Sequence, residues 1–160
     1  MASMNGGELL MRCLVQEGVK QVFGIPGSQT STFIDAICRL GPSQGIEFVM
    51  TRHEAAAHMA DAVSRISDRV GACTRTVGPG AINLATRFYV AYNDSIPMVA
   101  ITPQIHSNRS YPFQSSMQQL NQKDLFRPIT ECDEGSGLVF CIVNLQLNRP
   151  IILENAKYKT

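Results

Sequence analysis

The order of apolar and polar positions along the chain predicts an alternation of helices and strands. Leu9, Leu10, Cys13 and Leu14 recur at helical spacing, whereas residues 96–102 form a continuous apolar run typical of a strand buried on both faces. The same criteria predict helices at 7–17, 31–40, 55–66, 81–92 and 117–124. They predict strands at 20–24, 46–50, 70–77, 96–102, 126–130 and 150–154.

Glycine and proline mark the ends of these segments. Gly18 is expected to end the first helix and Gly41-Pro42 the second, because neither residue type favours continued helix. The segment 131–148 is harder to interpret. Its run 138–143 favours a strand by composition, while a parallel topology asks for a crossover helix before the last strand, and both readings stay open.

Strands that alternate with helices through short connections indicate an α/β fold. We expect a three-layer sandwich, in which a mostly parallel sheet of about six strands carries helices on both faces. The 160 residues are sufficient for one such domain, spanning 1–160. Ligands of open parallel sheets bind at the carboxyl ends of the strands.

Composition and charge exclude several classes of protein. A net charge of +1 with scattered basic residues gives no footprint for nucleic acid or for a membrane surface. No apolar run reaches the roughly 20 residues that cross a bilayer, and the first residues lack a signal-peptide pattern. We therefore expect a cytoplasmic protein that binds neither nucleic acid nor membrane.

Neither the cysteines nor the histidines have the spacing of metal ligands. The five cysteines form no C-x-x-C pair, and their odd number favours reduced thiols. His53 and His58 are five residues apart and do not stack on one helix face as i, i+4 ligands do. No metal site is expected in this chain.

Three corners between a strand and a helix are the candidates for chemistry. They lie at 24–28, at 51–54 and at 76–83. Small residues let a ligand ring approach the backbone, and the starts of helices offer unpaired N–H groups. Each corner alone is also ordinary turn chemistry, so only the combination carries weight.

In this order the corners resemble the N-terminal pyrimidine domain of thiamine-diphosphate enzymes of the acetolactate synthase and 2-oxo acid decarboxylase group. The resemblance covers residues 8–127. Its motifs are Val22-Phe23-Gly24-Ile25-Pro26-Gly27, Arg52-His53-Glu54, Met59-Ala60-Asp61, Gly78-Pro79-Gly80-Ala81 with Asn83-Leu84, Asp94-Ser95-Ile96-Pro97, Thr102-Pro103-Gln104 and Phe113-Gln114.

The resemblance assigns roles to individual residues. Glu54 corresponds to the catalytic glutamate, which hydrogen-bonds a ring nitrogen of the aminopyrimidine and shares a proton with it. The positions that contact the cofactor are Ile25, Pro26, Thr76, Pro79 and Asn83, and those on the substrate side are Ser28, Phe113 and Gln114. Ile25 departs from the synthase pattern, which often has an aromatic residue there.

The implied activity is decarboxylation of a 2-oxo acid or carboligation, with thiamine diphosphate as the electron sink. In the family, Mg²⁺ and the diphosphate are bound by another domain through a Gly-Asp-Gly motif, which this sequence lacks. The expected partner is therefore a diphosphate-binding domain or subunit, or the remainder of a longer chain. We also expect a homo-oligomer, and an isolated chain without activity.

Two arginines depart from the family pattern. Arg75 falls within an expected strand, where a buried cation needs a partner, and Arg87 replaces a position that is often glycine. Arg75 is expected to reach the rim, to meet an acid, or to mark a domain relieved of catalysis. The alternative function is thus a non-catalytic descendant acting as a binding or scaffold protein. The retained Glu54 argues against it.

Overall fold

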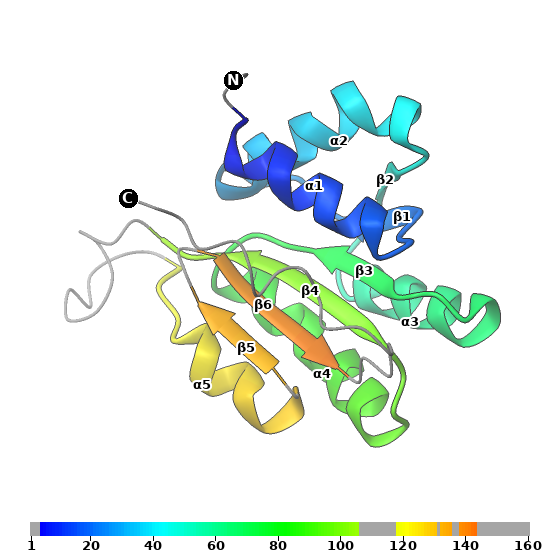
Figure 1. Ribbon diagram of the computed structural model, residues 1–160. Coiled ribbons are helices and arrows are strands. Elements are labelled where there is room, and N and C mark those ends of the chain that lie inside the picture. The colour runs from blue at the N-terminus through cyan, green and yellow to red at the C-terminus, as the bar shows by residue number, and fades with distance from the viewer. Residues whose placement is uncertain (1–3, 106–117, 131, 136–137, 144–160) are drawn as a thin grey trace.

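Helices cover both faces of a central sheet (Figure 1). A computed structural model describes residues 4–105, 118–130, 132–135 and 138–143. Within these residues the sheet has six strands in the order β2-β1-β3-β4-β6-β5. The expected α/β fold with helices on both faces of a mostly parallel sheet is confirmed.

The element bounds follow the predicted alternation closely. The helices are α1 (Gly6–Gln16), α2 (Ser31–Gln44), α3 (Ala55–Ser67), α4 (Pro79–Asn93) and α5 (Gln122–Phe126), with 3-10 turns η1 (Ser28–Thr30) and η3 (Arg127–Ile129). The strands are β1 (Gln21–Gly24), β2 (Glu47–Met50), β3 (Gly71–Thr74), β4 (Met98–Pro103), β5 (Cys132–Gly135) and β6 (Leu138–Val143). None of the helices in the described ranges has the length and apolar character to cross a membrane.

The strand order explains why helices lie on both faces. The chain passes from β1 to β2 in one direction across the sheet, then returns to β3 on the other side of β1 and continues to β4, with all four strands parallel. Because crossover connections are right-handed, the reversal places α2 opposite α3 and α4. The reversal lies between β1 and β3, which is the switch point where parallel sheets bind ligands.

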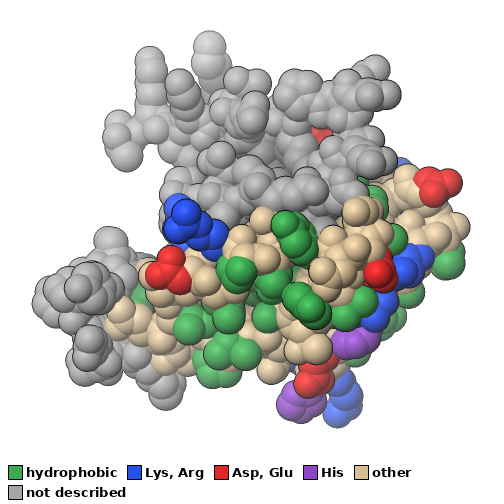
Figure 2. All heavy atoms as spheres, turned by 90° about the horizontal axis from the view of Figure 1, so that it is seen from below, with side chains coloured by type: hydrophobic (Ala, Val, Ile, Leu, Met, Phe, Trp, Pro, Cys, Tyr) green, Lys and Arg blue, Asp and Glu red, His purple; other side chains and the backbone are tan. Residues whose placement is uncertain are grey.

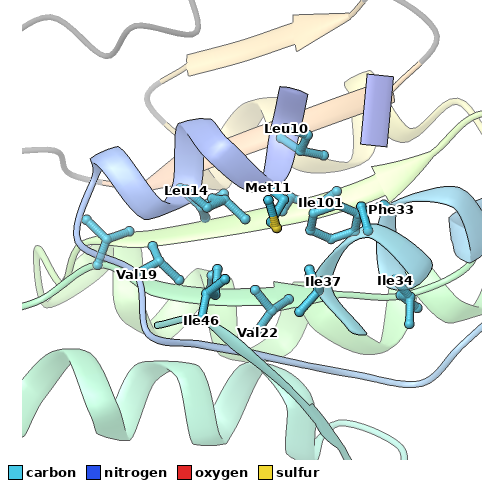
Figure 3. Close-up of a cluster of buried hydrophobic side chains, with 14 residues drawn as sticks. Leu10, Met11, Leu14, Val19, Val22, Phe33, Ile34, Ile37, Ile46 and Ile101 are labelled. Carbon is cyan, nitrogen blue, oxygen red and sulfur yellow. The ribbon is translucent and has the colours of Figure 1, made fainter. Parts of the chain in front are cut away.

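Alternate side chains of the four parallel strands, β1 to β4, fill two separate cores. Val22 of β1 packs under α1 and α2, whereas its neighbour Phe23 packs under α3 and α4. In β4, Ile101 joins the first core and Ala100 the second. Figure 3 shows the first core, in which Met11, Leu14 and Phe33 from α1 and α2 close over the sheet. Because successive side chains point to opposite faces and both faces are buried, successive residues of these strands are apolar.

Three predicted bounds are corrected by the structure. Residues 126–130 are not a strand, because α5 is followed by η3, where Pro128 fixes a helical φ and the Thr130 hydroxyl donates to the Phe126 carbonyl at 2.9 Å. The helix expected at 117–124 begins at Gln122, after Asn121 caps it. The helix expected at 31–40 continues through Gly41-Pro42 to Gln44 and ends at Gly45, whose φ of 71° is left-handed.

The edge of the sheet beyond β4 shows whether residues 138–143 form a strand. Residues 138–143 form β6, which pairs antiparallel with β4, so the strand favoured by composition is present there. A crossover helix directly before the strand expected at 150–154 is not tested, because residues 144–160 are not described. The structure adds β5, which pairs antiparallel with β6 and was not predicted. The strand predicted at 150–154 lies outside the described residues.

Asn5 caps α1 and provides a test of local stability. Its side-chain oxygen accepts the Glu8 N–H at 2.9 Å, which satisfies one of the unpaired donors of the first turn. Asn5→Ala is expected to lower the free energy of unfolding by about 1 kcal/mol. Asn5→Ser, which keeps an acceptor, should be nearly neutral in the same urea titration. Equal losses in both variants would show that the cap contributes nothing.

Candidate functional site

The three corners found in the sequence meet at the carboxyl ends of adjacent strands. Gly24 at the end of β1 pairs with Met50 of β2 on one side and with Thr74 of β3 on the other. The Thr51 N–H donates to the Gly24 carbonyl at 2.8 Å, which ties the second corner to the first. A Cβ on Gly24 would overlap the Thr74 carbonyl, so glycine is needed for this close approach. The corners thus share one rim.

Thr76 joins the first corner to the third. A Cβ at Gly27 would stand 2.7 Å from Thr76 Cβ, and one at Gly80 would stand 2.8 Å from Thr76 Cγ2, so both glycines are required by contact with this residue. The Thr76 hydroxyl also donates to Gln29 Oε1 at 3.1 Å. Thr30 Oγ1 accepts the Gly27 N–H at 3.0 Å and closes the turn. This packing fixes the distance between the two corners.

Glu54 stands at the start of α3, where the second corner ends. His53 before it has a φ of 41°, an uncommon backbone conformation for a residue other than glycine. His58 Nδ1–H donates to the Glu54 carbonyl at 3.0 Å and holds the backbone of this first turn. The Glu54 side chain is exposed and makes no hydrogen bond to any described residue. Its carboxylate is therefore free to meet a ligand.

The first turn of α4 forms the third side of the rim. Gly78, with a φ of 62°, precedes the helix, and Pro79 occupies its first turn, where its missing N–H is no loss. Pro79 is exposed and Asn83 is half-buried, one turn further along the same helix. A Cβ on Gly78 would overlap the Gln118 carbonyl, so the chain after β4 packs against this turn.

The remaining predicted positions divide into two groups. Pro26 and Ser28 are exposed on the first corner, and Ile25 beside them is half-buried. Phe113 and Gln114, expected on the substrate side, lie outside the described residues.

Sequence reasoning missed Gln29 and Gln122, which shape the rim from within. Gln29 accepts the Thr76 hydrogen bond, and Gln122, only 1% exposed, donates to the Pro103 carbonyl at the end of β4 at 2.7 Å. The one available signal for Gln29 was a polar residue directly after the first corner.

Arg75 lies under this rim without a partner. It follows β3, and its side chain is on the side of α3 and α4, since its Cβ is 3.7 Å from where a Cβ of Gly80 would stand. The residue is 5% exposed, its Nε is cut off from solvent without a hydrogen bond, and it forms no ion pair within the described ranges. Burial lowers the pKa of the guanidinium, and the negative charge of Glu54 opposes this lowering. Thus Arg75 reaches the rim but stays buried and unpaired.

Arg87 has a partner that the sequence did not reveal. Asp61 of α3 is 1% exposed, and its Oδ2 accepts from Arg87 of α4 and from Arg65 Nε at 2.8 Å. Arg65 also pairs with Asp94 at 2.5 Å, beyond the end of α4. Burial by itself raises the pKa of the Asp61 carboxyl, but the hydrogen bonds and charges of Arg65 and Arg87 outweigh it and hold that pKa below its usual value. The cluster joins the two helices whose first turns carry Glu54 and Pro79.

The rim combines a carboxylate with open backbone and with small or apolar surfaces. It offers an unpaired carboxylate at Glu54, backbone that glycines leave open, and the small or apolar surfaces of Ile25 and Pro79. Within the described residues no group of three or more His, Cys, Asp or Glu side chains is placed to hold a metal ion. A hollow of ≈ 510 Å³ lies at the opposite end of the strands, lined by residues such as Lys20 and Glu47, and does not touch the corners.

Comparisons with known proteins agree with this geometry. Residues 4–125 match the family model of the thiamine pyrophosphate enzyme, N-terminal TPP binding domain. The chain is 46% identical to the acetolactate synthase large subunit of Haemophilus influenzae over 109 residues, which are 68% of this chain and 18% of that protein. It is 39% identical to the acetolactate synthase isozyme 3 large subunit of Escherichia coli over 132 residues, 82% of this chain and 22% of that protein.

A third relative is the acetolactate synthase of Bacillus subtilis, 40% identical over 127 residues, 79% of this chain and 21% of that protein. The chain therefore spans about a fifth of the length of these relatives. The family match extends from the start of α1 into α5 and includes all three corners of the rim. The chain thus belongs to the thiamine pyrophosphate enzymes, as a member of their N-terminal domain family.

Proposed function

We propose that this chain is the pyrimidine-binding half of a thiamine-diphosphate-dependent 2-oxo acid decarboxylase or carboligase of the acetolactate synthase type. The observation that carries the proposal is the meeting of three corners at one rim, with Glu54 exposed at the start of α3 and making no side-chain hydrogen bond to a described residue. Bound thiamine diphosphate supplies the electron sink for cleavage beside the 2-oxo group.

In this proposal different residues of the chain bind the cofactor, transfer a proton and face the substrate. Glu54 would hydrogen-bond a ring nitrogen of the aminopyrimidine and hold or return a proton there. Ile25, Pro26, Thr76, Pro79 and Asn83 would contact the cofactor, while Ser28, Phe113 and Gln114 would face the 2-oxo acid. Their placement on one rim supports the first of these groups, and the packing of Thr76 between Gly27 and Gly80 would keep the pocket rigid.

The proposal includes a second domain that binds the diphosphate with Mg²⁺, supplied by another subunit or by the rest of a longer chain. The face over α3 and α4 supports such a partner, because apolar side chains gather on it (Figure 2). Exposed apolar residues on these helices are Met59, Ile66, Ile82, Tyr89 and Tyr92. Ile66 is 83% exposed and Tyr89 is 57% exposed, which is unfavourable for a face in water. We also propose assembly into a homo-oligomer, and a cytoplasmic location.

A second candidate function is a binding or scaffold protein that has lost catalysis. One observation favours it: Arg75, a buried cation with no ion pair to a described residue, lies under the corner that would receive the cofactor. A domain without cofactor would tolerate such a charge more readily than a working active site. Glu54 argues for the first candidate, because a scaffold has no need of a free carboxylate at the rim.

Calorimetric titration with thiamine diphosphate and Mg²⁺ separates the two candidates. The chain is titrated alone and together with the complementary part of an acetolactate synthase large subunit, such as that of Escherichia coli. We expect little heat from the chain alone, because most of the binding free energy comes from the diphosphate and the metal. With the partner we expect binding and pyruvate decarboxylation. Absence of both in a mixture that forms a stable complex would favour the scaffold.

A further inference from the structure

Arg75 is the buried charge that the proposed function leaves unused. It is 5% exposed, and its Nε has neither a solvent contact nor a hydrogen bond. A buried cation without a counter-charge costs free energy, so a fold that keeps one usually brings an anion to it. The described ranges place no carboxylate within ion-pair distance of Arg75.

The surroundings of Arg75 increase its need for negative charge. Its Cβ lies beside the first turn of α4, 3.7 Å from where a Cβ of Gly80 would stand. The first turn of α3 starts at the same rim, at the carboxyl ends of the strands. The first turns of helices carry partial positive charge, so the two helix starts at this rim offer Arg75 no compensating negative charge.

Glu54 is the carboxylate that can meet this need. Its negative charge acts on the Arg75 guanidinium, and its side chain is exposed and makes no hydrogen bond to a described residue. A glutamate side chain with this freedom can turn inward at the small cost of fixing its rotamers. We propose that Arg75 is a positioning residue for Glu54, whose carboxylate its unpaired guanidinium draws into the space between the first turns of α3 and α4.

This pairing has a consequence for cofactor binding, which rests on the proposed function. A carboxylate drawn toward Arg75 is not available to the aminopyrimidine ring, so the ring must displace the guanidinium before it reaches Glu54. The apparent affinity for the cofactor equals the intrinsic affinity multiplied by the fraction of molecules in which Glu54 is not paired with Arg75. Pairing therefore lowers the apparent affinity. Arg75 would thus weaken cofactor binding, the opposite of what a cofactor-contacting arginine does.

A double-mutant cycle tests the pairing without any cofactor. The unfolding equilibrium constants of wild type, Arg75→Met, Glu54→Gln and the double variant are compared in urea. We expect a coupling of about threefold or more between the two positions. Arg75→Lys, which keeps the charge, should retain most of it. Arg69→Met is the control, because this exposed arginine precedes the opposite end of β3 and should show no coupling with Glu54. Additive effects of Arg75→Met and Glu54→Gln would overturn the proposal.

A second measurement does not depend on the folding of an Arg75 variant. The ¹⁵N resonance of Arg75 Nε is recorded in wild type and in Glu54→Gln. We expect it to shift when the carboxylate is removed, and an unchanged resonance would count against the pairing.

Thiamine diphosphate titration of the partner-bound chain then tests the consequence. Arg75→Met is expected to lower the dissociation constant about threefold to tenfold, and Arg75→Lys to leave it near the wild-type value. Weaker cofactor binding by Arg75→Met would contradict the proposal that Arg75 competes with the aminopyrimidine ring for Glu54. It would indicate instead that Arg75 contacts the cofactor. Coupling in the cycle with no cofactor binding by any variant would instead overturn the proposed function and leave the pairing intact.

Discussion

Glu54→Gln is expected to remove the decarboxylase activity of the chain when it is combined with a diphosphate-binding partner. The amide can still hydrogen-bond a ring nitrogen, but it cannot hold or return a proton at neutral pH. Proton transfer by a positioned side chain contributes about 10²–10⁴-fold to rate, and a loss of this size is expected in kcat. Pyruvate consumption at saturating cofactor is the measurement. Activity within a few-fold of wild type would remove Glu54 from the proposed role.

Glu47→Gln is the matched control for this substitution. Both glutamates are exposed, but Glu47 is the first residue of β2 and its Oε1 accepts from Gln21 Nε2 at 3.2 Å, whereas Glu54 lies beyond the carboxyl end of the strand. Because Glu54 makes no side-chain hydrogen bond to a described residue, its replacement should change the free energy of unfolding by no more than about 0.5 kcal/mol. A loss of activity at Glu54 alone, with both variants equally stable, isolates the carboxylate at the rim.

The parallel core of the fold was predictable because each strand there is buried on both faces. In β4 all six residues are buried, and the corresponding apolar run has no competing helical pattern. The stretch after it was less readable. Phe126 and Ile129 gave the segment 126–130 a strand-like composition, but their contacts are made from a helix end and a 3-10 turn that pack on α4. Tertiary packing, rather than local preference, decides such short segments.

In the candidate site, too, some features could be predicted from the sequence and others could not. The corners could be found because glycine and proline leave a local signature in the sequence, and the structure brings them to one rim. The surroundings of Arg87 and Arg75 could not be found in this way. Arg87 meets Asp61, which is 26 residues away along the chain, and this pairing depends on how α3 and α4 are aligned. That Arg75 forms no ion pair with a described residue is likewise a property of the packed structure.

Asp61→Ala is expected to have the largest effect on stability. The Asp61 carboxylate is 1% exposed and holds Arg65 and Arg87. Its removal takes from Arg87 the one ion pair that the described residues give it, whereas Arg65 keeps its pair with Asp94. Breaking a buried ion pair by removing one partner costs about 3–5 kcal/mol. Here the arginines are 34% and 25% exposed and can turn partly to water, which reduces the expected loss. We expect about 2–4 kcal/mol in urea denaturation.

Asp35→Ala provides a control at a carboxylate that is exposed and pairs with one arginine instead of two. Asp35 Oδ2 accepts from Arg39 Nε at 2.8 Å across one helical turn, as Asp61 Oδ2 does from Arg65 Nε at the same distance. The Asp35 side chain is 56% exposed, and exposed pairs of this spacing contribute about 0.3–0.5 kcal/mol. A small loss at Asp35 beside a large one at Asp61 would assign the effect to burial. Equal small losses would show that the cluster does not hold α3 and α4 together.

The contribution of Asp61 should also depend on pH in a defined direction. The pKa of this carboxyl is lowered in the folded chain from its ordinary value of 3.8, so the unfolded chain binds its proton first as the pH falls. The stability that the carboxylate contributes is therefore complete above the unfolded pKa and is lost as the pH falls through the lower, folded one. Unfolding free energies of wild type and Asp61→Asn should accordingly converge below about pH 4 and remain apart at neutral pH. A difference that does not change with pH would mean that Asp61 acts through its shape, because the charge that binds Arg65 and Arg87 disappears on protonation.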